Sequence, residues 1–189
     1  MGSAINAAYS RDIGSKDLFT PLELLMKSAA LLSLTSLILT CAGAASAQTT
    51  VAPRNLSSAA AVQLAQQTVA ACSADGHNVA AAVVDRSGVL LALVRADGAG
   101  PHTPNAATAK AFTSASSRNP TSGMAKAIQS NPDAAGLAQI PGFLVLAGGV
   151  PIKAGNDTLG AIGVGGAPGG HLDEACAQKA LAAMKDQLQ

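Results

Sequence analysis

Beyond residue 48, the side chains best suited to chemistry are three histidines, which are His77, His102 and His171. His102 is the strongest candidate, because it follows Gly100 and Pro101 in a predicted loop where its imidazole is not committed to a core. Such an imidazole can coordinate a metal or act as a general base. Lys110, one to two turns into the next predicted helix, adds a cation that could meet a carboxylate. The plainer alternative is an exposed loop histidine and a solvated lysine.

A second candidate site is the glycine-rich stretch that precedes His171, with Gly165, Gly166, Gly169 and Gly170. Backbone N–H groups at the positive end of a helix dipole suit a carboxylate or a phosphate. No Lys-Ser or Lys-Thr follows, and no parallel strand with an acidic end, so neither a P-loop nor a dinucleotide site is indicated. The alternative is a tight turn whose glycines allow close packing, with Asp173 favouring the helix start.

Composition and motifs exclude several other classes. The net charge is +1 from 12 basic and 11 acidic residues, so we expect no nucleic-acid partner. Aromatic residues make up 2% of the chain, too few for a base-stacking platform. There is no H-E-x-x-H, C-x-x-C or G-x-S-x-G motif, which disfavours a standard hydrolase. His77 lies in an Asp-Gly-His-Asn turn.

Alternating helical and strand patterns predict the elements that position these residues. Helices are expected at 58–74, 103–115, 122–129 and 172–188, with Thr103 and Pro104 starting the second, and strands at 79–84, 89–94, 143–147, 150–154 and 158–164. Short Gly-containing turns join the strands within each group as hairpins. We therefore predict an α+β fold with a single antiparallel five-stranded sheet and packed helices.

The N-terminal region has the pattern of an export signal. Residues 26–47 run from Met26 and Lys27 through an uncharged apolar centre to Ala45-Ser46-Ala47, which predicts a signal peptide cleaved after Ala47. The apolar centre is shorter than the roughly 20 residues of a membrane-spanning helix, so we expect no stable membrane anchor. A lipid on Cys41 is the alternative. Residues 1–25 carry charges that fit no leader, so we interpret them as an upstream start region and Met26 as the true start.

Export leaves Cys72 and Cys176 in a periplasmic or secreted domain of residues 48–189. Two cysteines on predicted helices at opposite ends of one domain favour a disulfide. Two buried thiols on apolar helical stripes are the alternative.

Four segments, taken in their order and spacing, resemble the GlcG/HbpS family of haem-binding proteins. They are VVDRSG at 83–88, RADGAGPHT at 95–103, KAFT at 110–113, and GAIGVGGAPGG at 160–170 followed by Asp173 and Glu174. The likeness covers nearly all of residues 56–189.

The resemblance implies a profilin-like layer of helices on a sheet, homo-oligomers, and members that bind or degrade haem, hold iron or modulate a sensor kinase. Together with the leader pattern of residues 26–47, it implies here an exported haem-binding protein assisting haem sequestration or degradation, with His102 as the ligand of the iron. The remaining candidate haem contacts are Thr103, Lys110, Gly165, Gly166, Gly169, Gly170 and His171. Two alternatives are an enzyme acting on a small oxygenated organic acid, with His102 as base and Lys110 or Arg95 as clamp, and an accessory partner of a membrane sensor.

Overall fold

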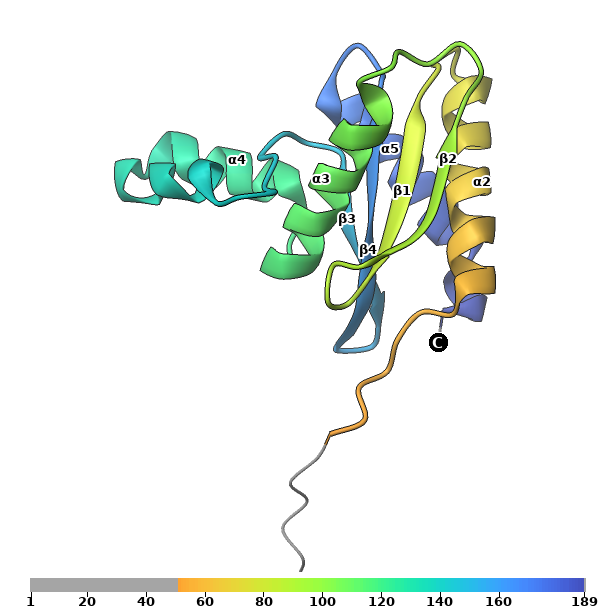
Figure 1. Ribbon diagram of the computed structural model, residues 1–189, viewed down its shortest axis with the longest axis horizontal. Helices are drawn as coiled ribbons and strands as arrows, with labels where there is room; N and C mark the ends of the chain where they lie inside the picture. The colour runs from red at the N-terminus through yellow and green to blue at the C-terminus, as the bar shows by residue number, and fades with distance from the viewer. Residues whose placement is uncertain (1–50, 189) are drawn as a thin grey trace, which may run out of the picture. The chain divides into compact units, whose positions relative to one another are not determined.

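The computed structural model describes residues 51–188, which form ten helical and strand elements (Figure 1). They are α2 Ser58–Ala74, β1 Ala80–Asp85, β2 Leu90–Arg95, α3 Thr103–Ser117, α4 Thr121–Ser130, the 3-10 helix η2 Pro132–Gln139, β3 Gly149–Ala154, β4 Asp157–Gly165, α5 Gly170–Ala183 and the 3-10 turn η3 Lys185–Gln187. The predicted start region at 1–25 and the predicted signal peptide at 26–47 lie outside the described residues. Within those residues, no helix is both long and apolar enough to cross a membrane.

The α+β class is confirmed, but the predicted fifth strand is wrong. The described residues form one sheet of four strands in the order β2-β1-β4-β3, and every neighbouring pair is antiparallel. Residues 143–147 are apolar, yet they pack against α3 and do not extend the sheet. Leu144 N donates to Thr113 Oγ1 at 2.8 Å, and the Phe143 ring meets Phe112 edge-on at 6.0 Å between centroids.

Strand β1 is buried on both sides and divides the core into two layers. Ala81 and Val83 belong to the larger cluster, which includes residues of α2 and α5. Ala80, Ala82 and Val84 belong to a smaller cluster with alanines of α3. This two-residue alternation is the expected consequence of a strand covered on both faces.

Helices α2 and α5 share one face of the sheet and are joined by a covalent bond. The predicted disulfide between Cys72 and Cys176 is present, with the two Cα atoms 5.3 Å apart. Three residues further along each helix, the Lys179 ammonium donates to the Asp75 carboxylate. That hydrogen bond, together with the positive charge of Lys179, lowers the pKa of Asp75 from its ordinary 3.8. A buried bond and an exposed ion pair therefore fix the same pair of helices.

Helix α3 covers the opposite face with very little side-chain volume in between. A Cβ added to Gly163 of β4 would overlap the Ala107 carbonyl and the Ala111 backbone nitrogen of α3. Ala107 and Ala111 are themselves completely buried. Because only glycine permits this close approach of two backbones, Gly163 determines how closely α3 packs on β4.

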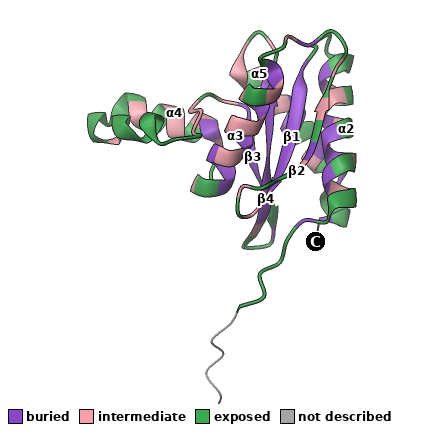
Figure 2. Ribbon diagram, viewed as in Figure 1, coloured by how far each residue is buried: buried purple, intermediate pink, exposed green. Residues whose placement is uncertain are grey.

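Helix α4 and η2 form an arm that projects from the sheet and its covering helices (Figure 1). Thr121 is the only buried residue of α4, and η2 has none. Figure 2 shows the arm almost entirely as exposed or intermediate residues, in contrast to the purple strands. The arm is thus ordered without a core of its own.

Candidate functional site

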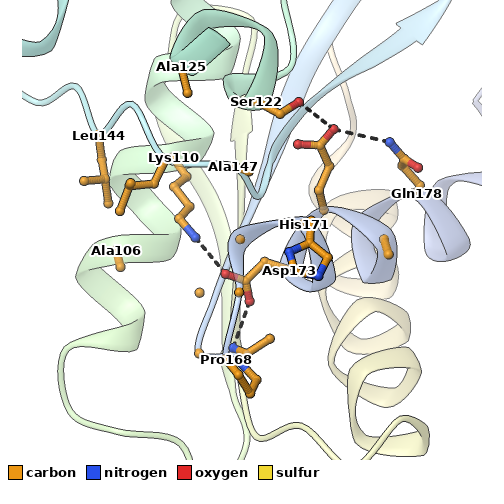
Figure 3. Close-up of a pocket in the computed structure, with 18 of the residues that line it drawn as sticks. Ala106, Lys110, Ser122, Ala125, Leu144, Ala147, Pro168, His171, Asp173 and Gln178 are labelled. Atoms are coloured by element: carbon orange, nitrogen blue, oxygen red, sulfur yellow. Dashed lines mark hydrogen bonds and ion pairs between the residues drawn. The ribbon is translucent and has the colours of Figure 1, made fainter. Parts of the chain in front are cut away.

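A cavity of about 830 Å³ lies where α3, α4 and α5 meet the loop after β4 (Figure 3). Its apolar wall is built from Ala106, Ala125, Leu144, Leu146 and Ala147. This volume lies within the range of roughly 300–1,000 Å³ that holds small molecules and cofactors. Most of the residues singled out in the sequence line it, which are His102, Lys110, Gly165, Gly166, Gly169, Gly170 and His171.

Two imidazoles reach this cavity from the starts of two helices. His102 occupies the cap position just before α3, one residue earlier than the predicted helix start, and His171 is the second residue of α5. Both side chains are exposed, and neither forms a hydrogen bond with any residue of 51–188. They are free to bind a ligand.

Lys110 lines the cavity but is already committed to the protein. Its Nζ donates to Asp173 Oδ2 at 2.7 Å and to the carbonyl of Val164 at 2.9 Å, and the ion pair is buried (Figure 3). The contact between Lys110 and a propionate stays a prediction, and in this structure the lysine ammonium contacts Asp173 of α5. The same Asp173 accepts a hydrogen bond from Ala167 N at 3.0 Å through Oδ1. The pair consequently fastens the glycine-rich loop to α3, and Asp173 has a larger role than favouring a helix start.

The glycine-rich loop ends at a helix start with unused N–H groups. Gly169 caps α5 without a side-chain hydrogen bond, and Leu172 and Asp173 donate back to its carbonyl. The amides of Gly170 and His171 make no backbone hydrogen bond among the described residues. The first turn of a helix favours anionic groups near such amides.

Sequence reasoning missed the polar end of the cavity, which α4 and α5 provide. Ser122, Ala125, Lys126 and Gln129 line it from α4, and Glu174 and Gln178 from α5. Glu174 Oε1 accepts from Ser122 Oγ at 2.9 Å and from Gln178 Nε2 at 3.4 Å. Its Oε2 is buried and has no hydrogen-bond partner in the described part of the chain. The spacing of 122, 125, 126 and 129 is that of one helix face, the signal that could have identified it.

Three candidates lie outside the cavity lining. Thr103 is buried, and its hydroxyl donates to the Gly100 carbonyl at 2.8 Å, so it closes a turn and offers no contact to a ligand there. Arg95 donates to the Ala99 carbonyl at 3.2 Å. His77 stays in its turn after α2, as predicted. Across residues 51–188, no group of three or more His, Cys, Asp or Glu side chains could hold a metal ion.

Comparison with protein families gives a match over most of the described chain. The family described as haem degrading protein HbpS-like matches residues 56–182. A comparison with curated proteins gives no match.

Solved structures share this fold. A double mutant of Streptomyces reticuli HbpS is 42% identical, with 75% of this chain and 94% of that chain covered and a TM-score of 0.69. Protein ORFY of Klebsiella pneumoniae is 26% identical, with 74% and 97% covered and a TM-score of 0.65. The PduOC haem complex is 22% identical, with 64% and 88% covered and a TM-score of 0.59, which is a likeness of fold.

Proposed function

Because the chain belongs to the HbpS-like family of haem-degrading proteins, we propose that it is an exported haem-binding protein that assists haem sequestration or degradation. Haem is taken in the cavity between α3, α4 and α5. The observation that carries the proposal is the pairing of an apolar wall with two imidazoles that have no partner among the described residues. The fold itself accommodates haem in PduOC.

The residues of the cavity fit the parts of a haem. The wall formed by Ala106, Ala125 and Leu144 removes apolar surface from water, and His102 offers a nitrogen ligand to the iron. Lys126, which is exposed, and the amides at the start of α5 offer donors to the propionates. The Glu174 carboxylate disfavours an anion at its own end of the cavity.

Lys110 and Asp173 act on the site through the loop that they hold. They are positioning residues, because each charge is already paired with the other and the pair holds the loop after β4 in place. Bound haem would supply the redox and oxygen chemistry of its iron, while the protein sets its ligand and surroundings.

Haem titration of the His102→Ala variant tests the proposal. Residues 48–189 contain no Trp and no Tyr, so a Soret band stands out against almost no absorption at 280 nm. We expect wild type to bind ferric haem with a Soret band that shifts and weakens in His102→Ala. His77→Ala is the matched control, since His77 does not line the cavity. Wild type that leaves the Soret band of free haem unchanged at every haem concentration would overturn the proposal.

Export is supported by the leader pattern of residues 26–47 and by the disulfide, which is typical of oxidising compartments. We expect the mature protein in the periplasm or outside the cell, beginning at Gln48. N-terminal sequencing of the protein from its own compartment measures this. A chain that retains Met26 would contradict cleavage.

Self-association is supported by two apolar surfaces that the described domain leaves uncovered. Leu137 of η2 and Ile140, just after η2, are both exposed. Separately, a hollow of about 520 Å³ is lined by apolar residues that include Leu90, Leu93 and Phe112. We expect a homo-oligomer, because exposed apolar patches of this kind mark interfaces. Light scattering should give a multiple of the chain mass in wild type and a smaller one in Leu137→Ser/Ile140→Ser.

A further inference from the structure

Both cavity histidines belong to the same short unit, a glycine followed two residues later by a histidine at a helix start. The units are Gly100-Pro101-His102 before α3 and Gly169-Gly170-His171 at the start of α5. They lie 69 residues apart, as their numbers show. The fold brings both to one cavity.

In each unit the imidazole lies against the glycine, in the space a Cβ would need. A Cβ on Gly100 would lie 2.9 Å from Cε1 and 3.0 Å from Nδ1 of His102. A Cβ on Gly169 would lie 2.7 Å and 2.8 Å from the same two atoms of His171. Any other residue at either position would force its ring to move.

The backbone does not require either glycine. Gly169 has φ −144° and ψ 141°, an extended conformation open to any residue, and Gly100 has no positive φ. The space each leaves is instead filled by a ring with no hydrogen bond to the described residues. Each glycine therefore leaves room for the ring position seen in the structure, and a larger residue there would displace the ring.

We infer that His102 and His171 would both ligate the iron of one bound haem, each from a ring position for which the glycine two residues before it leaves room. This rests on the proposed function. A porphyrin leaves two positions open on its iron, one on each face, and imidazole is a common ligand at such positions. The cavity has two imidazoles, from the starts of α3 and α5, beside an apolar wall.

The spectrum of the ferric haem complex tests the inference directly. Two imidazole ligands give a low-spin iron, whereas loss of one gives a high-spin iron, and both states are distinguished by visible absorption and electron paramagnetic resonance. We expect a low-spin wild type and a His171→Ala variant that still binds haem but is high-spin. Added imidazole should restore the low-spin spectrum of His171→Ala. His77→Ala should remain like wild type.

The glycines give a second test that leaves both histidines in place. Gly169→Ala and Gly100→Ala should each displace one ring and raise the high-spin fraction, with little change in the melting temperature. Gly123→Ala is the matched control, because a Cβ there meets nothing within 4 Å. It should leave the spectrum unchanged.

The outcomes separate this inference from the function on which it rests. No haem binding by wild type overturns both. Haem binding with a high-spin wild type, or a low-spin His171→Ala without added imidazole, overturns the two-histidine assignment and leaves the proposed function standing. Metal-free protoporphyrin should bind more weakly than haem, and equal binding would likewise reject ligation by the histidines.

Discussion

The two faces of the sheet are held by different means. On one face, α2 and α5 enclose the larger apolar cluster and are tied by the Cys72–Cys176 disulfide. On the other, α3 lies directly on β4 over alanine and glycine, and the buried Lys110–Asp173 pair beside the cavity joins it to the start of α5. Neither cysteine of the disulfide lines the cavity, whereas both members of the charge pair do. The two links can therefore be changed separately, and only the charge pair bears directly on the site.

The charge pair gives the largest expected effect. Lys110→Met leaves Asp173 buried without its counter-ion, which should lower the free energy of unfolding by about 3–5 kcal/mol. Urea denaturation measures the loss. Lys126→Met, which removes an exposed lysine from the same cavity, should change stability little.

A double variant checks the reason for that loss. Lys110→Met/Asp173→Leu removes both charges and should recover part of the stability, though not all, because Ala167 N loses its acceptor. If the double variant is less stable than Lys110→Met, uncompensated charge is not the cause.

The disulfide gives the next largest effect, on the other face. Its half-cystines are 104 residues apart, and removing it as Cys72→Ala/Cys176→Ala should cost about 2–4 kcal/mol of unfolding free energy. The haem spectrum should not change, because neither cysteine lines the cavity. Denaturation and haem titration on the same sample separate the two readouts. If Cys72→Ala/Cys176→Ala keeps wild-type stability but alters the haem spectrum, the disulfide acts on the site and not on stability, contrary to this prediction.

The disulfide and the Lys110–Asp173 ion pair also show how far the sequence could predict the structure. The predicted leader contains Cys41, so the predicted mature domain has only Cys72 and Cys176, and one intramolecular pairing could be predicted. Lys110 and Asp173 are 63 residues apart, and with 11 acidic residues in the chain no pattern selects Asp173 as the partner. Pairing of buried charges depends on tertiary packing, which local periodicity does not encode.

The helices and strands likewise include some that local sequence patterns predict and others that depend on tertiary contacts. Strands joined by Gly-containing hairpin turns were predictable because turn and period agree. Residues 143–147 have an apolar, strand-like composition. The backbone N–H of Leu144, however, donates to the Thr113 hydroxyl of α3 and not to a neighbouring strand. The helical spacing of its residues could have predicted which face of α4 lines the cavity. The hydrogen bond between that face and Glu174 of α5 is a tertiary contact, which the spacing does not predict.

The smallest expected effect concerns the exposed Asp75–Lys179 ion pair, which joins the end of α2 to α5, as the disulfide does. Because Lys179 lowers the pKa of Asp75 below its ordinary 3.8, the stability from this pair is present above that pH and is lost as the pH falls through the folded-state pKa. Wild type should therefore melt slightly above Lys179→Met at about pH 6, and the gap should close at about pH 2. A gap that widens on acidification would contradict this sign.

The position of the disulfide also determines how the protein responds to a cut in its backbone. Cys72 and Cys176 close a covalent ring that contains the whole arm from Thr121 to Gln139. Exposed segments such as η2 are preferred sites for proteases. A single cut there would turn one polypeptide into two that remain one molecule, and they would separate only on a reducing gel.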